Sequence, residues 1–204
     1  MRLSREAMAR NHERIVDAAG RLLRERGIEG TSVGDVMNAA GMTHGGFYRH
    51  FDSKDALVAA AAAASFTALT TGIDQRVSRE GDEAAMSAYV ADYLSAPHVA
   101  HPERGCPIAA LGIEAGRAAE PVRNAFAGGA AAILARFTRP DPEDRQARDG
   151  ALRQLAMMVG AVVIARAVGE HPLGAETLAA CAAIRLDKNA TGASDMPPPA
   201  SPGD

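Results

Sequence analysis

The segment GMTHGGFYRHFDSKDAL, residues 41–57, decides the fold class. Two adjacent glycines, Gly45 and Gly46, stand at the start of an expected short helix, although each glycine costs a helix about 1 kcal/mol. Phe47 and Phe51 are four residues apart, so they share one helix face and are expected to point into a core. The polar and aromatic residues between them are therefore expected to point outward.

Two helices are expected before this segment. Residues 4–26 carry apolar side chains at helical spacing, and Gly27 follows where a left-handed cap is expected. A second, short helix begins after Ser32, which is a plausible N-cap with Asp35 as its capping-box partner. Gly41 ends this helix.

Helices are also expected within and after the segment. The third covers about residues 45–51 with Thr43 as N-cap, and the fourth begins at Asp52 or Ser53 and runs to about residue 77. No strand pattern or internal repeat is evident, so the sequence predicts an all-α protein. The remaining expected helices are 82–95, 107–119, 121–138, 142–168 and 174–188.

Composition indicates a soluble protein of a reducing compartment. The chain has 204 residues and 47% hydrophobic residues, much of this alanine, which favours packed helices. Cys106 and Cys181 make no disulfide framework, and neither a signal peptide nor a long apolar run is evident. We therefore expect a cytoplasmic protein with no membrane partner.

The charge is unevenly distributed along the chain. Residues 1–54 hold nine Lys/Arg and seven Asp/Glu, a net charge of +2, whereas residues 55–204 hold thirteen and eighteen, a net charge of −5. A mildly basic head on an acidic body suits a local contact with an anion, although the asymmetry is small.

Helix, glycine-bearing turn and helix, supported by the first helix, make a helix-turn-helix unit, whose second helix enters the DNA major groove. Glycines without Cβ atoms let that helix approach the duplex closely. Arg49 and His44 could reach base edges, while hydroxyl and cationic groups could bind phosphates. The alternative is a plain helix–helix corner with these side chains in solvent. The residues expected to contact DNA are Ser32, Thr43, His44, Gly45, Gly46, Tyr48, Arg49, His50 and Lys54.

The run RIVDAAGRLLRERGIEGTSVGDVMNAAGMTHGGFYRHFDSKDALVAA closely resembles the DNA-binding head of TetR/AcrR-family bacterial repressors. The resemblance covers about residues 12–60, and Gly34 is a small departure from the family pattern. It implies an all-α homodimer: an N-terminal three-helix helix-turn-helix domain plus a C-terminal helical ligand-binding and dimerisation domain. Two heads would bind a palindromic double-stranded DNA operator, and a small-molecule effector would loosen them.

These implications set the expected domain organisation. Residues 1–53 form the helix-turn-helix domain, residues 54–189 the effector-binding and dimerisation domain, and residues 190–204 a disordered tail. The resemblance places the homodimer contact on the last two helices, where apolar residues recur at helical spacing; ordinary core positions would show the same pattern. These residues are Leu152, Leu155, Val159, Val162, Val163, Arg166, Leu178, Ala182 and Ile184.

An effector pocket is expected among the helices of the body. A mix of methionine and aromatic side chains suits a small apolar effector, although each residue could equally be part of the core. The candidate ligand-binding residues are Phe66, Met86, Tyr89, Tyr93, Cys106, Leu111, Phe126, Met157 and Met158.

Cys106 suggests a second way of sensing. It precedes Pro107 at a helix start and lies near Arg104, which favours the thiolate, so a thiol-based redox or electrophile sensor is an alternative to simple packing. His98 and His101 lie nearby, but no fourth ligand is evident, and we expect neither a metal nor a cofactor. No catalytic motif is evident, so we expect no enzyme; a helical effector-binding protein that never touches DNA remains an alternative.

Overall fold

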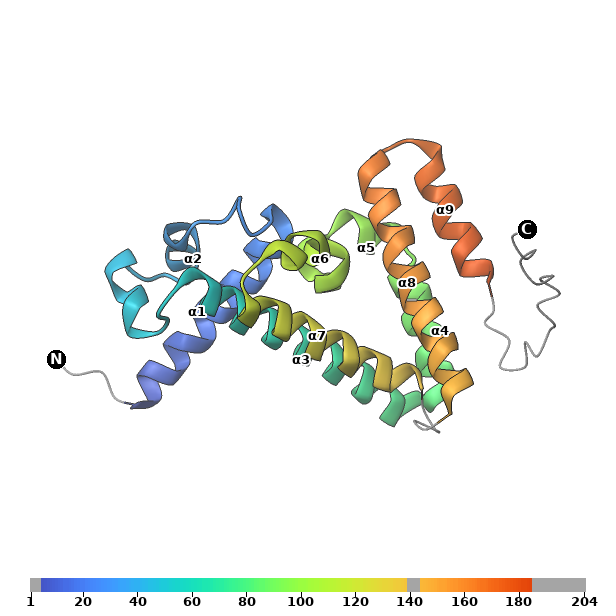
Figure 1. Cartoon of the computed structure of the whole chain (residues 1–204), viewed down its shortest axis with the longest axis horizontal. Coiled ribbons are helices and arrows are strands. Elements are labelled where there is room, and N and C mark those ends of the chain that lie inside the picture. The colour runs from blue at the N-terminus through green and yellow to red at the C-terminus, as the bar shows by residue number, and fades with distance from the viewer. Residues whose placement is uncertain (1–4, 139–143, 185–204) are drawn as a thin grey trace, which may run out of the picture.

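The computed structural model describes residues 5–138 and 144–184, and every regular element in these ranges is a helix (Figure 1). The all-α prediction is therefore confirmed. The elements are α1 (Arg5–Arg26), α2 (Val33–Ala39), η1 (His44–Arg49), α3 (Lys54–Glu80), α4 (Asp82–Tyr93), α5 (Ala96–Ala100), η2 (Pro102–Arg104), α6 (Pro107–Arg117), α7 (Glu120–Phe137), α8 (Arg145–Val168) and α9 (Pro172–Ala183).

Helix α1 is amphipathic, as its sequence predicts. Ile15, Ala19 and Leu23 are buried, whereas Arg21 on the other face is exposed. The helix stops before Gly27, whose φ of 81° lies in the left-handed region that favours glycine.

Helix α2 begins with the capping box expected from the sequence. The Ser32 hydroxyl accepts a hydrogen bond from the Asp35 amide at 3.1 Å, and the Asp35 carboxylate accepts one from the Ser32 amide at 3.0 Å. Two donors that the helix start would leave unpaired are thereby satisfied. After the helix, Gly41 turns the chain toward η1 with a φ of 69°.

The third helix differs from expectation in its winding. Residues His44–Arg49 form a 3₁₀ helix, and Thr43 precedes it without making a side-chain cap hydrogen bond. Short 3₁₀ pieces of this kind are common connectors. Helix α3 then begins at Lys54, because the Ser53 hydroxyl accepts from the Ala56 amide at 3.1 Å.

Helices α3 and α7 lie side by side through the middle of the molecule (Figure 1). Gly129 of α7 faces Phe66 of α3 so closely that a Cβ on the glycine would lie 2.2 Å from the ring. Phe66 also meets Phe126 edge to face, with ring centroids 5.4 Å apart. The missing side chain at Gly129 is thus what lets the two helices approach.

Helices α8 and α9 form a hairpin at the opposite end of the molecule from η1 (Figure 1). Gly169 ends α8 with a φ of 61°. Gly174 of α9 is buried against Ala165 of α8, where its Cβ would meet the backbone at 3.4 Å.

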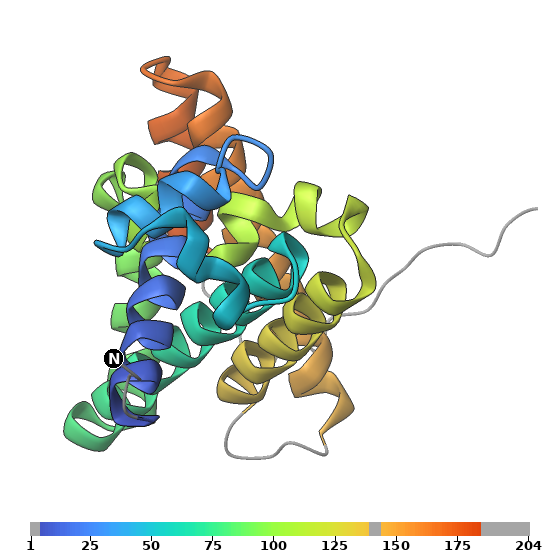
Figure 2. The same cartoon turned by 90° about the vertical axis from the view of Figure 1, so that its left-hand side faces the viewer.

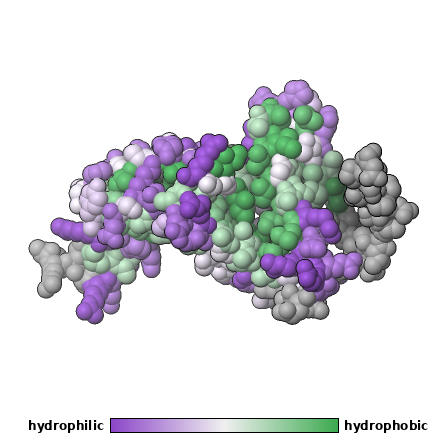
Figure 3. Space-filling view, viewed as in Figure 1, coloured by the Kyte–Doolittle hydropathy of each residue, from purple (hydrophilic) through white to green (hydrophobic). Residues whose placement is uncertain are grey.

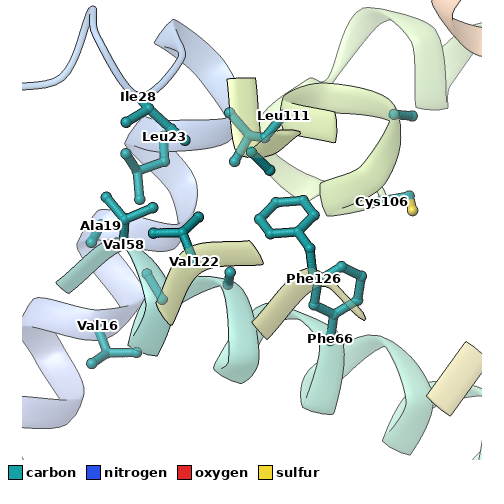
Figure 4. Packing of buried hydrophobic residues seen from close by; sticks show 14 of the residues in the cluster. Val16, Ala19, Leu23, Ile28, Val58, Phe66, Cys106, Leu111, Val122 and Phe126 are labelled. Carbon is teal, nitrogen blue, oxygen red and sulfur yellow. The ribbon is translucent and has the colours of Figure 1, made fainter. Parts of the chain in front are cut away.

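A single apolar cluster connects the head to the body. It runs from Val16 and Leu23 of α1 through Val58 of α3 to Val122 and Phe126 of α7 (Figure 4). Because α3 contributes to both parts, the expected domain boundary at residues 53 and 54 falls at the start of a shared helix and remains a prediction.

Helix ends in the body differ from the expected ones by a few residues; for example, α4 ends at Tyr93 instead of residue 95 and α6 at Arg117 instead of residue 119. The five-residue α5 was not expected, and α9 begins at Pro172 instead of residue 174. Both starts carry a proline in the first turn, where the missing N–H is tolerated. The expected helical residues 142–143 and 185–188 and the tail 190–204 lie outside the described residues.

Helices α3 and α8 are long and apolar enough to cross a membrane by length and composition alone, which is weak evidence. The apolar side chains of α3 pack largely against α1, α4 and α7. Helix α8 is less covered, and the α8–α9 hairpin shows apolar surface (Figure 3). The large exposed apolar side chains of the hairpin are Leu152, Ile164, Leu173 and Ile184.

Candidate nucleic-acid interface and effector region

The short helix η1 is anchored from below by two phenylalanines. Phe47 is 1% exposed and Phe51 is buried, and their rings stack with centroids 5.8 Å apart. Phe51 in turn stacks on His12 of α1 at 4.6 Å. The sequence prediction that both phenylalanines face the core is confirmed.

The opposite side of η1 is open to solvent. Tyr48 is 72% exposed, and Thr43, His44 and Arg49 are exposed as well. This side belongs to the end of the molecule that faces the viewer in Figure 2. Gly46, His50 and Lys54 are half-buried beside it. The structure thus gathers most of the expected DNA-contacting residues on one surface.

The two glycines of η1 differ in what surrounds them. A Cβ on Gly45 would meet no atom within 4 Å, whereas one on Gly46 would touch the Met37 side chain at 3.5 Å, an ordinary contact. Packing among the described residues therefore does not require a glycine at position 45. A glycine would be required there if another molecule approached the backbone closely.

Ser32 and Lys54 stand at the starts of the two helices that flank η1. The Ser32 hydroxyl already donates to the Asp35 carboxylate at 2.5 Å, so its proton is engaged within the capping box. Lys54 is the first residue of α3, where the helix dipole adds to the attraction of its ammonium group for a phosphate.

His50 is less suited to pairing with a phosphate than the sequence suggests. Burial lowers its pKa, and repulsion from His12 and Arg49 lowers it further. Its ring centroid lies 6.0 Å from that of His12. The neutral form of His50 is therefore favoured near pH 7. A neutral imidazole can donate a hydrogen bond to a phosphate but cannot form an ion pair with it.

Comparison with known proteins agrees with this geometry. The model for bacterial regulatory proteins of the tetR family matches residues 15–61, which cover the second half of α1, all of α2 and η1, and the start of α3. The chain belongs to the TetR family. The resemblance noted from the sequence is therefore confirmed.

Two curated relatives match the head only. The transcriptional repressor KstR2 of Rhodococcus jostii is 46% identical over 44 residues, 22% of each chain. The regulator YvdT of Bacillus subtilis is 38% identical over 73 residues, 35% of this chain and 36% of its own. The matches thus span well under two thirds of either relative.

The fold of the whole chain is also known from solved structures. The reduced form of NemR from Escherichia coli aligns with 85% of this chain and 94% of its own, with a TM-score of 0.71 and 20% identity. At this identity the likeness shows a common fold. The common fold covers the body as well as the head.

The residues expected to form the effector pocket of this TetR-family chain are mostly core. Phe66 and Phe126 are buried against each other, and Leu111 and Met158 are also buried. The side chains of Met86, Tyr89 and Met157 are half-buried, and Tyr93 and Cys106 are buried. No cavity given by the described residues is lined by this set as a whole, so its role in ligand binding remains a prediction.

One hollow among the described residues lies elsewhere. It has a volume of about 270 Å³ and lies between α1 and α3, where Arg21, Arg24 and Asp17 meet small residues of α3. A second space of about 10 Å³ borders it and includes Leu111. That space has room for about one water molecule.

Cys106 lies in a buried polar cluster that the sequence does not reveal. Its amide donates to His98 Nε2 at 3.1 Å, and His98 Nδ1 lies 2.7 Å from the Tyr93 carbonyl oxygen. His98 must therefore carry its proton on Nδ1 and is neutral. The thiol is 2% exposed, which disfavours direct attack by an oxidant in this state.

Two contacts join the head to this part of the body. The Arg24 guanidinium of α1 donates to the Glu103 carbonyl oxygen through Nε at 3.0 Å and Nη2 at 2.6 Å. The Glu114 carboxylate of α6 accepts from the Ile28 amide at 2.6 Å and the Glu29 amide at 3.3 Å. Both connect residues more than 75 positions apart, so periodicity in the sequence gave no sign of them.

Because His98 is neutral in the folded protein, we expect the protein to be less stable at acidic pH. Burial lowers its pKa, partly offset by the Tyr93 carbonyl, and Arg166 lowers it further. An unfolded histidine titrates near pH 6.5, so below this pH the unfolded chain binds a proton that the folded chain resists. We expect the free energy of unfolding to fall with decreasing pH, by at most about 1.4 kcal/mol per pH unit for this group.

Urea unfolding followed by circular dichroism from pH 7.5 down to about pH 5 measures this slope. His98→Gln should reduce it, and His44→Gln, at an exposed position of η1, is the control. His50 contributes in the same direction, so some slope remains in both variants. An unaltered slope in His98→Gln would contradict the assignment of the neutral ring.

Proposed function

We propose that the chain is a transcriptional repressor that binds a palindromic DNA operator as a homodimer and is released by a small effector. The observation that carries this proposal is the exposed side of η1, anchored by Phe47 and Phe51 and headed by a glycine that internal packing does not require. The match of residues 15–61 to the TetR-family model supports the same role for this surface.

The roles of the exposed residues follow from their chemistry. The Arg49 guanidinium is suited to donate two hydrogen bonds to a guanine edge in the major groove, and His44 to reach a neighbouring base. The hydroxyls of Thr43 and Tyr48 and the ammonium of Lys54 are suited to phosphate oxygens, which fix position without reading sequence. Gly45 allows the backbone to approach the duplex.

The α8–α9 hairpin is the proposed contact between the two copies. Leu152 is 46% exposed, and Ile164, Leu173 and Ile184 are exposed on the same hairpin. A surface of this kind is unusual on a monomer and is covered in an oligomer. By contrast, Val162 and Leu178 are buried within the protomer and belong to its own core. A dimer with two heads matches a two-fold symmetric operator.

The body is the proposed effector-binding part, and the cytoplasm the proposed location. Arg24 and Glu114 connect the body directly to α1 and to the turn after it. A ligand that shifts α6 or η2 would therefore change the position of the head. Because the Cys106 thiol is buried, this route is favoured over direct sensing through the thiol.

The test is a titration of the protein with a duplex selected from random palindromic sequences, at several salt concentrations. A repressor should bind this duplex tightly, with an affinity that falls steeply with salt, because lysines and arginines displace counterions from the phosphates. Size-exclusion chromatography with light scattering on the same sample should show a dimer. Equal affinity for the selected duplex and a scrambled one would contradict the proposal.

Arg49→Ala should weaken binding to the selected duplex by about 1–3 kcal/mol and relax base preference at one position of each half-site. Fluorescence anisotropy on a set of single-base operator variants measures both effects. Lys54→Ala is the matched control, because it should weaken all duplexes alike and reduce the salt slope by about 1 per site. Identical profiles for the two variants would show that Arg49 reads no base.

A further inference from the structure

One corner of the body gathers hydrogen-bond donors without partners. We call it the basic corner and define it as Tyr93, His98, Cys106, Arg166 and the first turn of α6. Tyr93, the last residue of α4, is 4% exposed; its hydroxyl lies beside the Cys106 thiol, a weak hydrogen-bonding group, and has no oxygen or nitrogen partner among the described residues. Buried polar groups are nearly always paired in native proteins, so an unpaired hydroxyl here calls for a partner.

Arg166 of α8 supplies a second unpaired donor. Its Nη2 donates to the His98 carbonyl oxygen at 2.7 Å and its Nε to that of Val99 at 3.2 Å, which fixes the guanidinium plane. Its Nη1 is buried and has no hydrogen-bond partner within the described ranges. Burial and the neighbouring Cys106 raise the pKa of the Tyr93 phenol, and the nearby Arg166 guanidinium lowers it in part.

The corner also has an excess of positive charge. Arg166 and Arg24, which approaches from α1, are half-buried. Burial lowers the pKa of both, and Cys106 and Glu103 offset this in part, but neither arginine forms an ion pair with a carboxylate of the residues that the structure describes. The nearest acidic group, Glu103, is engaged with His101 at 3.3 Å and with Arg104 at 3.4 Å. Buried cations are normally paired with an anion.

The start of α6 adds to this charge. Cys106 is its N-cap residue but makes no side-chain cap hydrogen bond, and Pro107 brings no N–H to the first turn. The positive end of the helix dipole is therefore left without a carboxylate or hydroxyl cap. A Cβ on the neighbouring Gly105 would lie 2.5 Å from His98 and 3.3 Å from Arg166, so the glycine lets the loop lie tightly against both.

An oxyanion would satisfy the unpaired donors, the positive charge and the uncapped start of α6 together. A carboxylate accepts hydrogen bonds from a guanidinium and a phenol at once, neutralises the buried charge and suits a helix start. The adjacent wall is aromatic: Tyr89 lies 5.9 Å from Tyr93 and 6.0 Å from Phe137 between ring centroids. The molecule that fits is therefore an organic acid with an apolar body.

We propose that the basic corner binds the carboxylate of a small organic acid, held by the Tyr93 hydroxyl and Arg166 Nη1, and that this acid is the effector. The second part rests on the proposed repressor function. The link to DNA is short, because the loop that carries Glu103 and Cys106 also accepts the two hydrogen bonds of Arg24 from α1. An acid seated beside Cys106 shifts that loop and with it α1.

The first experiment measures binding without DNA. The full chain is titrated with octanoate and benzoate, and with octanamide and benzamide as neutral isosteres, at matched ionic strength, and its melting temperature is followed. The acids should raise the melting temperature and the amides should not. Equal shifts for acid and amide, no shift with either acid, or an equal shift with chloride or sulfate would overturn the proposal.

Variants separate a binding site from a structural one. Tyr93→Phe removes only the unpaired hydroxyl, so it should raise the melting temperature of the free protein yet weaken octanoate binding at least about tenfold. Thr67→Val, which removes an exposed hydroxyl of α3 that lies outside the basic corner, is the control and should leave octanoate binding unchanged. Arg166→Met should abolish the preference of acid over amide, and circular dichroism reports whether it folds.

Cys106→Ser decides whether the thiol takes part. The variant should keep binding octanoate within about twofold, because the charge and the hydroxyl that hold the acid are intact. A loss as large as that of Arg166→Met would show that the thiolate itself is the anion of the corner and would overturn the proposal.

The second experiment adds the operator duplex. Octanoate should weaken operator binding by the wild type and leave Tyr93→Phe unaffected. If the acid bound but the affinity for the operator did not change, the acid would not be the effector, although the basic corner would still be an acid-binding site. If the free protein bound no duplex specifically, the proposed repressor function would be wrong. The titration without DNA would still show whether the basic corner binds an acid.

Discussion

Replacing Phe47 by alanine is expected to lower the free energy of unfolding by about 3–5 kcal/mol. The ring is 1% exposed and is held between the stacked ring of Phe51 and the edge of Tyr48, with centroids 5.8 and 5.2 Å away. Removing it leaves a cavity beneath a 3₁₀ helix of six residues, which has little stability of its own. Equilibrium unfolding in urea, followed by circular dichroism, measures the loss.

The neighbouring Tyr48 provides the control. Because its side chain is 72% exposed, Tyr48→Ala should change stability by less than about 0.5 kcal/mol. The free energy of unfolding should therefore be much lower in Phe47→Ala than in Tyr48→Ala, although both variants should bind the operator more weakly. Similar losses of stability in both would show that η1 is rotated relative to the arrangement described above.

Replacing Gly129 by alanine is the second large effect expected. In an open helix the substitution would stabilise by about 1 kcal/mol, since alanine is the better helix former. Here the new Cβ would lie 2.2 Å from the Phe66 ring, at Cγ as well as at Cδ2, and the edge-to-face contact with Phe126 limits how far the ring can move away. Overpacking of about 1–3 kcal/mol should outweigh the helix gain and lower the melting temperature.

The adjacent glycine of α7 is a nearly ideal comparison. A Cβ on Gly128 would meet nothing within 4 Å, so Gly128→Ala should raise the melting temperature by the helix propensity gain alone. Thermal unfolding of the two variants side by side tests the register of α7 on α3. A destabilised Gly128→Ala with a tolerated Gly129→Ala would mean that α7 faces α3 with its other side.

Local signals in the sequence were enough to predict the head. The capping box of Ser32 and Asp35, the left-handed cap at Gly27, the helix end at Gly41 and the pair Phe47 and Phe51 each act over four residues or fewer, and the structure confirms them. The 3₁₀ winding of η1 was not predictable in this way. Its residues satisfy the same pattern of buried and exposed positions as a short α-helix.

Local signals in the sequence did not predict the contacts within the body. Met and aromatic residues at helical spacing suggested a pocket, but Phe66 and Phe126 fill the space between α3 and α7 themselves. The contacts of Arg24 with Glu103 and of Arg166 with His98 and Val99 join positions 67 to 79 apart. Which arginine turns inward is decided by tertiary packing, which a helical pattern does not encode.

The length of α3 has a mechanical consequence. Its 27 residues form a rod of about 40 Å that is clamped to α7 over much of its length and presents Lys54 beside η1. Tilting such a rod by about three degrees about its far end moves its tip by about 2 Å. Under the proposed function, α3 would act as a lever: a small rearrangement near α4 and α7 would displace the end of the helix that lies beside the proposed DNA-contacting surface.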